Sequence, residues 1–150
     1  MISTPDAAIA DSTEETSNRV EMIETVISSL EQEGTAMVSH AQEGYLWKFS
    51  YGEAEVFVQL TGLTDDDTLT VWSAVTALPD APEAEKLVKL LELNWSTTLE
   101  SRFALLNGNI SVVTSRTLAG LSPSEVSRCI TIVATLADEY QEPLKAEFGG

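Results

Sequence analysis

The side chains that could carry covalent or metal chemistry are few and scattered. The chain has one cysteine, Cys129, and one histidine, His40. Nucleophilic catalysis needs a nucleophile, a base and an orienting group held together. Cys129 falls within an apolar helical stripe, where a buried and unreactive thiol is expected, and His40 falls in a weakly patterned segment, where we expect it to face solvent. One cysteine and one histidine also cannot build a zinc cage or an internal disulfide.

No short motif makes up for this scarcity. The sequence contains no G-x-S-x-G element, phosphate-binding loop, dinucleotide-binding glycine run or H-E-x-x-H pair. Asp65, Asp66 and Asp67 form the tightest acidic cluster, but consecutive carboxylates lack the alternating ligands and the distal glutamate of a calcium loop. We therefore predict a solvated loop, no metal, no cofactor, no catalytic residue and a protein that is not an enzyme.

Two arginines are candidates for ligand recognition. Arg102 and Arg116 could each supply a polar group to an apolar cavity, as in a ligand-sensing domain. Exposed arginines in an acidic chain more often form surface ion pairs, and we expect that arrangement for both.

Composition limits the partners of the protein. The 150 residues include 24 acidic and 8 basic side chains, for a net charge of −16, and 43% are hydrophobic. This is enough apolar material for one domain with a core. The negative charge repels nucleic acid and anionic membranes. No apolar run approaches the length of a membrane span and no secretory leader is recognised, so we predict a cytoplasmic protein.

The first half of the chain predicts one helix and three strands after a flexible acidic tail at residues 1–11. Ser12 and Glu15 have the form of a capping box for a helix over about 13–33, which Gly34 would end. A hairpin turns at Gly52-Glu53, and a further strand covers 68–78. Residues 35–41 are either a loop or a short additional edge strand. The hairpin register pairs Phe49 with Val56, Trp47 with Val58 and Tyr45 with Leu60.

The second half predicts a helix, a hairpin and a long helix. The helix over about 82–94 has an inner stripe of Leu87, Leu90 and Leu91. Asn107-Gly108 is a strong hairpin signal, and a last helix runs from Pro123 to Tyr140 or beyond. The hairpin pairs Leu105 with Ile110 and Phe103 with Val112. The order of helix, three strands, helix, two strands and helix predicts an α+β fold with a mostly antiparallel sheet, in one domain over 12–148.

This order and three segments resemble the YbjN family over about residues 14–142. The segments are Leu90-Leu91-Glu92-Leu93-Asn94, Arg102-Phe103-Ala104-Leu105 and Ala137-Asp138-Glu139-Tyr140. The resemblance implies a fold like that of type III secretion chaperones, which are small, acidic, usually dimeric proteins that bind segments of other proteins without catalysis. Such domains also occur in cyanobacteria, where a relative of this fold acts as a shell assembly factor. The family has in addition been tied to sensory regulation.

Apolar residues on the second side of the sheet are the candidate binding site. If the aromatic residues of the first hairpin face the helices, strand alternation turns Leu46, Phe57 and Trp72 to the other side. These three residues would then form an exposed apolar patch, and such patches mark interaction sites. Two alternatives remain open. One of the helices covers this side, or helix surfaces with Val88, Leu93 or Ile132 form a dimer seam.

The function that these observations favour is a non-enzymatic protein-binding module that recognises a segment of a client protein. The resemblance implies that this module is a homodimer. The excess of acidic residues would favour basic clients, chiefly through the rate of association. The alternative is a ligand- or signal-sensing regulatory domain with a cavity between helices and sheet.

Overall fold

A computed structural model of the chain describes residues 19–31, 37–41 and 44–149, and for 37–41 the backbone only. The predicted tail, the capping box at Ser12 and Glu15, and Gly34 lie outside these residues.

The described residues form a six-stranded sheet in the order β1-β2-β3-β4-β6-β5, in which every pair of neighbours is antiparallel. The strands are β1 (Met37–Ala41), β2 (Gly44–Tyr51), β3 (Ala54–Leu60), β4 (Thr68–Ala77), β5 (Arg102–Leu106) and β6 (Asn109–Thr117). The predicted α+β fold with an antiparallel sheet is confirmed. Four strands and not three precede the second helix, because residues 37–41 pair with β2 as an edge strand.

Three helices accompany the sheet. The N-terminal helix is described over residues 19–30, α2 spans Ala84–Ser96 and α3 spans Pro123–Phe148. The α3 helix begins as predicted, because the Ser122 hydroxyl accepts a hydrogen bond from the Glu125 amide and Pro123 occupies the first turn. It continues beyond Tyr140 and ends at Gly149, whose φ of 69° is left-handed.

Turn chemistry fixes the register of both hairpins as predicted. Gly52 has a φ of 57° while Glu53 keeps a negative φ, which suits a type II′ turn. Asn107 and Gly108 both have positive φ, at 51° and 78°, which suits a type I′ turn. The observed partners include Phe49 with Val56, Trp47 with Val58, Tyr45 with Leu60, Phe103 with Val112 and Leu105 with Ile110.

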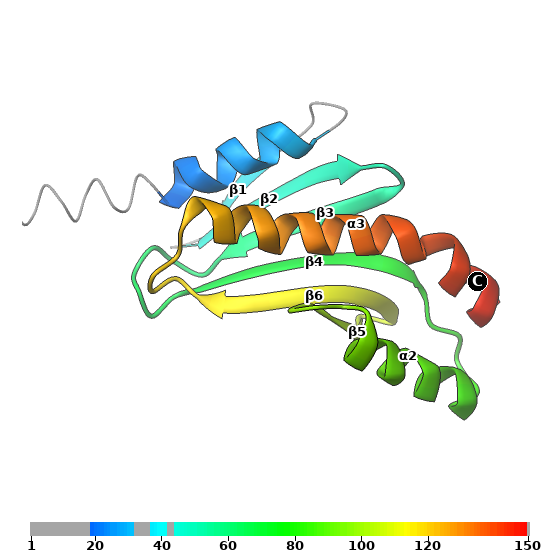
Figure 1. The fold of residues 1–150 in the computed structure, drawn as a ribbon. Helices are drawn as coiled ribbons and strands as arrows, with labels where there is room; N and C mark the ends of the chain where they lie inside the picture. Colours follow the sequence, from blue (N-terminus) through cyan, green and yellow to red (C-terminus); the bar gives the residue numbers. More distant parts are fainter. Residues whose placement is uncertain (1–18, 32–36, 42–43, 150) are drawn as a thin grey trace, which may run out of the picture.

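The N-terminal helix and α3 cover one side of the sheet, which we call the inner face (Figure 1). The N-terminal helix lies over β1 and β2, and α3 crosses β3, β4 and β6. The Trp47 indole donates to the Glu24 carboxylate at 3.1 Å and so ties the N-terminal helix to β2. Side chains of the inner face are almost fully buried, among them Trp47, Phe49, Val56, Val58, Leu60, Leu69, Val71 and Val112.

Two predicted positions on the helices are wrong. Leu91 was expected on the inner stripe of α2, but it is 68% exposed, because α2 packs on β5 through Leu90 and the partly buried Leu87 and Leu93. Ile132 was a candidate for a dimer seam, but it is buried. The α3 helix packs on β4, β3, β6 and β2, so its buried surface is wider than one stripe.

Candidate protein-binding surfaces

The side of the sheet opposite the helices, which we call the outer face, carries the three predicted site residues. Leu46, Phe57 and Trp72 are half-buried, whereas the neighbouring inner-face residues on the same strands, Trp47, Val58 and Val71, have almost no exposure. Phe57 lies opposite Trp72 in the register of β3 and β4, and their rings stack with centroids 5.3 Å apart and planes 11° from parallel. Leu46 lies one strand away on β2, diagonal to Phe57. Leu46, Phe57 and Trp72 therefore point to the outer face, as strand alternation predicts. A binding role for these three residues stays a prediction.

One row of outward positions crosses five strands through the aromatic stack. The strand registers join Lys48 to Phe57, Phe57 to Trp72, Trp72 to Val113, and Val113 to Arg102. The Lys48 ammonium lies 3.1 Å from the Glu55 carboxylate. Arg102 is exposed and has no ion pair with any described residue. The expectation that Arg102 forms a surface ion pair is thus wrong, because its strand turns it away from the acid-rich helices and loops.

A second exposed apolar surface lies on α2, and the sequence interpretation found only part of it. Val88, Leu91 and Trp95 are 54%, 68% and 93% exposed and recur at helical spacing, so they form one stripe. Leu99, just beyond the helix, is also exposed. Val88 was a candidate seam residue, whereas Leu93 is partly buried. The spacing of residues 88, 91 and 95 was the available signal for Trp95. We call these residues the α2 stripe.

At the edge of the sheet beside α2, the Asn94 side chain bonds to outward backbone groups of β5, and we call this the closed edge. The Asn94 amide accepts a hydrogen bond from the Phe103 backbone N–H at 2.7 Å and donates one to the Phe103 carbonyl at 3.3 Å. These backbone groups point away from β6, where an additional strand would bind. Asn94 thus occupies the outward backbone groups of Phe103, which strand addition along β5 would need. At the other end of the sheet, the terminal strand is β1.

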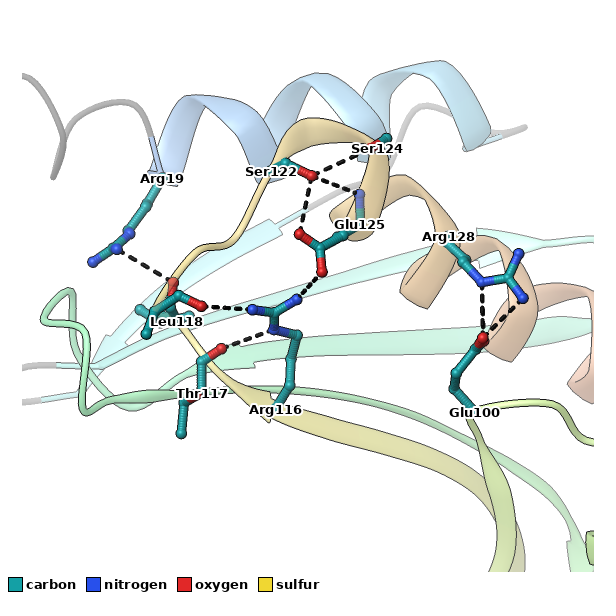
Figure 2. Close-up of polar contacts among 10 residues, drawn as sticks. Arg19, Glu100, Arg116, Thr117, Leu118, Ser122, Ser124, Glu125 and Arg128 are labelled. Carbon is teal, nitrogen blue, oxygen red and sulfur yellow. Dashed lines mark hydrogen bonds and ion pairs between the residues drawn. The ribbon is translucent and has the colours of Figure 1, made fainter.

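A pocket of about 320 Å³ between β6 and α3 is lined by charges that are already paired (Figure 2). Arg116 bonds to Glu125, as expected, and to the Thr117 and Ala119 carbonyls. Arg128 holds Glu100 through three hydrogen bonds of 2.8 to 3.0 Å. These arginines lower the pKa of Glu125 and Glu100. Because each arginine is matched by a carboxylate, this pocket gives little support to the ligand-sensing alternative.

Cys129 lines the same pocket without the features of a nucleophile. The thiol is half-buried and not fully buried as expected, and its burial raises its pKa. A raised pKa keeps the sulfur protonated near neutral pH, where a nucleophile would need to be a thiolate. His40 lies in β1 opposite Tyr45, and its side chain is outside the described residues.

The acidic loop between β3 and β4 is predicted to be solvated, but it also forms hydrogen bonds within itself and an ion pair with the N-terminal helix. Asp67 accepts hydrogen bonds from the Thr64 amide and hydroxyl and from the Thr61 hydroxyl, which lower the pKa of its carboxyl. Asp65 lies 2.6 Å from the guanidinium of Arg19 on the N-terminal helix. Among the described residues no cluster of acids, histidine or cysteine is suited to a metal ion.

The fold and these surfaces define a small α+β domain with a half-buried apolar outer face and an exposed apolar α2 stripe. The chain belongs to the YbjN family, whose profile, "Putative bacterial sensory transduction regulator", matches residues 19–146. No curated protein matches the chain. Within the described ranges, no helix is long and apolar enough to cross a membrane.

The comparison with solved structures gives two similar chains. A chain in the crystal structure of the ExsC–ExsE complex is 12% identical with a TM-score of 0.53, over 85% of this chain and 93% of that one. A chain of the ExoU–SpcU complex from the type III secretion system of Pseudomonas aeruginosa is 13% identical with a TM-score of 0.42, over 80% of this chain and 94% of that one. The predicted likeness in fold to type III secretion chaperones is confirmed.

Proposed function

We propose that this protein is a cytoplasmic, non-enzymatic protein-binding module that holds a segment of a client protein on the outer face of its sheet. The observation that carries the proposal is the stacked pair of Phe57 and Trp72, which stays half-buried on the face opposite the N-terminal helix and α3. The solved relative in fold is part of a complex of two proteins, which agrees with a binding role.

The energetics of the outer face favour a partner. Covering about 100 Å² of apolar surface stabilises a complex by about 2.5 kcal/mol. Tryptophan is among the residues that contribute most to interfaces, because one rigid ring buries a large area at a small entropic cost. Trp72 and Phe57 already stack on each other, so little further ordering is needed when a client side chain packs on them.

The closed edge at β5 limits how a client can bind. Strand addition requires free backbone groups along an edge, and Asn94 occupies those of Phe103. A client strand would therefore add at β1, and a client held by side-chain anchors would lie across the outer face.

We also propose that two copies associate through the α2 stripe. Val88, Leu91 and Trp95 expose large apolar side chains on one side of a helix, and Leu105 and Leu106 of the neighbouring β5 are exposed as well. A dimer would bury this surface and leave the outer face free for a client. In size-exclusion chromatography with light scattering, Leu91→Asp should give monomers, while Ala119→Asp, which adds the same charge in an exposed loop, should keep dimers.

The client site is tested by affinity capture from lysate with the wild type, Trp72→Ala and Trp95→Ala, followed by mass spectrometry. We expect Trp72→Ala to lose a protein that the wild type and Trp95→Ala both retain. Equal capture by all three proteins would count against the outer face as the client site.

A further inference from the structure

The charge of the outer face differs from that of the whole protein. Among the outward positions of β2 to β6, the charged residues are Lys48, Glu55 and Arg102, so this face has one more base than acids. The whole chain has 24 acidic and 8 basic residues. The outer face is therefore a place where a carboxylate can approach the protein without meeting a surplus of acids.

Arg102 is the cation on this face that remains available. Glu55 already neutralises Lys48 at 3.1 Å, whereas no described acid pairs with Arg102. At physiological salt, charges farther away than about 8 Å are largely screened. A carboxylate in contact with Arg102 would thus feel this guanidinium more than the distant acids that set the net charge. A guanidinium also binds a carboxylate through two parallel hydrogen bonds.

The registers fix the spacing between this cation and the aromatic stack. Arg102 on β5 lies in one row with Trp72 on β4, with β6 between the two strands. Strands are about 4.8 Å apart, so the two positions are separated by about 10 Å. An extended peptide advances about 3.3 Å per residue and turns every second side chain to the same side, so residues two or four positions apart share a face and lie about 7 or 13 Å apart. These two separations bracket the span of about 10 Å.

Resting on the proposed function, we propose that the client segment carries a large apolar or aromatic residue that packs on Phe57 and Trp72 and an acidic residue, two or four positions away on the same side of the extended segment, that pairs with Arg102. Global charge alone would favour a basic client. Local charge on the binding face favours an acidic one, because the contact is made where acids are scarce.

The test is selection of a phage-displayed library of random 12-residue peptides on four immobilised proteins, which are the wild type, Arg102→Glu, Trp72→Ala and Lys145→Glu. Lys145 is exposed in the last turn of α3 and has no ion pair with a described acid. Lys145→Glu is the control, because it changes the net charge by the same amount as Arg102→Glu but lies away from the outer face. The wild type and Lys145→Glu should both enrich an apolar residue with Asp or Glu two or four positions away. Selection on Arg102→Glu should replace the acid with Lys or Arg.

A winning peptide then gives the size of the effect. Changing its acid to the corresponding amide should weaken binding to the wild type roughly two- to fivefold, as expected for one exposed ion pair, and should not weaken binding to Arg102→Glu. Peptides that need Trp72 but show no acid, and no change with Arg102→Glu, would overturn this inference and leave the proposed function standing. Peptides that bind Trp72→Ala as well as the wild type would overturn the proposed function itself. Binding of a fluorescent oligothymidine that depends on both Trp72 and Arg102 would contradict a protein client.

Discussion

The two faces of the sheet are built from the same strands and carry similar residues, yet they differ in burial. On the inner face Trp47 and Phe49 are each 1% exposed beneath the helices. On the outer face Phe57 and Trp72 stack on each other and stay half-buried. Residue type does not separate the faces. The side taken by the N-terminal helix and α3 makes one face the core and leaves the other face uncovered by these two helices.

Truncation of one phenylalanine on each face should give the largest difference. Phe49→Ala removes a fully buried ring and should lower the free energy of unfolding by about 3–5 kcal/mol. Phe57→Ala removes a half-buried ring and its stacking, and should cost about 1 kcal/mol. Urea unfolding followed by circular dichroism measures both. Equal losses would mean that the outer face belongs to the folded core and not to a binding surface.

The second largest loss of stability should come from a change in the turn between β2 and β3, which sets the register and so assigns residues to the two faces. Gly52 has a positive φ, and an added Cβ would overlap the Asp138 carboxylate of α3, so that carboxylate would have to move. That carboxylate also accepts a hydrogen bond from the Glu53 amide at 2.9 Å. Gly52→Ala should lower the free energy of unfolding by about 2 kcal/mol. Gly108→Ala, where φ is positive but the surroundings are open, should cost about 1 kcal/mol in the same urea experiment.

Removal of the Asn94 side chain, which covers the edge of β5, should have a smaller effect on stability. Asn94→Ala leaves the outward backbone groups of Phe103 without their amide partner and should cost about 1 kcal/mol. It should also expose β5 to strand addition, seen as concentration-dependent thioflavin T binding. Ser96→Ala, at an exposed hydroxyl of the same helix, serves as the control and should change neither quantity. Thioflavin T binding by the control as well would show that Asn94 does not protect the edge.

The smallest expected effect is the contribution of Asp67, in the acidic loop, to the pH dependence of stability. Hydrogen bonds from Thr64 and Thr61 lower the pKa of Asp67 below the ordinary 3.8. A carboxyl whose pKa is lower in the folded protein than in the unfolded protein stabilises the fold fully at a pH above its unfolded pKa. This stabilisation is lost as the pH falls through the pKa of the folded state. The urea midpoint of the wild type should therefore fall below about pH 4, and Asp67→Asn should flatten part of that fall. An identical pH profile for both proteins would show that Asp67 does not contribute.

The registers could be predicted from sequence because turn residues and alternation agree. At Gly52 and at Asn107-Gly108 the turn type alone sets which residues pair, and the apolar pattern selects the same answer. The orientation of Phe57 and Trp72 follows from that register. The helix over 84–96 was harder, because its apolar residues occupy most of its circumference, and only packing on β5 shows that Leu91 and Trp95 are left outside.

The pairing of charges was predictable only where it is local. Arg116 meets Glu125 across a short connection at the start of α3, and the expected ion pair forms there. Arg102 lies in a chain rich in acids, but its strand turns it to the face where acids are scarce. Composition describes the whole surface and cannot place a single guanidinium. The pairing of Arg128 with Glu100, between α3 and the segment before β5, likewise depends on the fold.

The three tryptophans allow the central claim to be tested in one measurement. Trp47 is buried under the N-terminal helix, Trp72 lies on the outer face and Trp95 lies on the α2 stripe. The protein labelled with 5-fluorotryptophan gives three ¹⁹F resonances, which single Trp→Phe variants assign. When a captured client segment is added at constant protein concentration, the Trp72 resonance should shift while those of Trp47 and Trp95 stay. A shift of Trp95 or Trp47 with Trp72 unchanged would contradict the claim that the outer face holds the client.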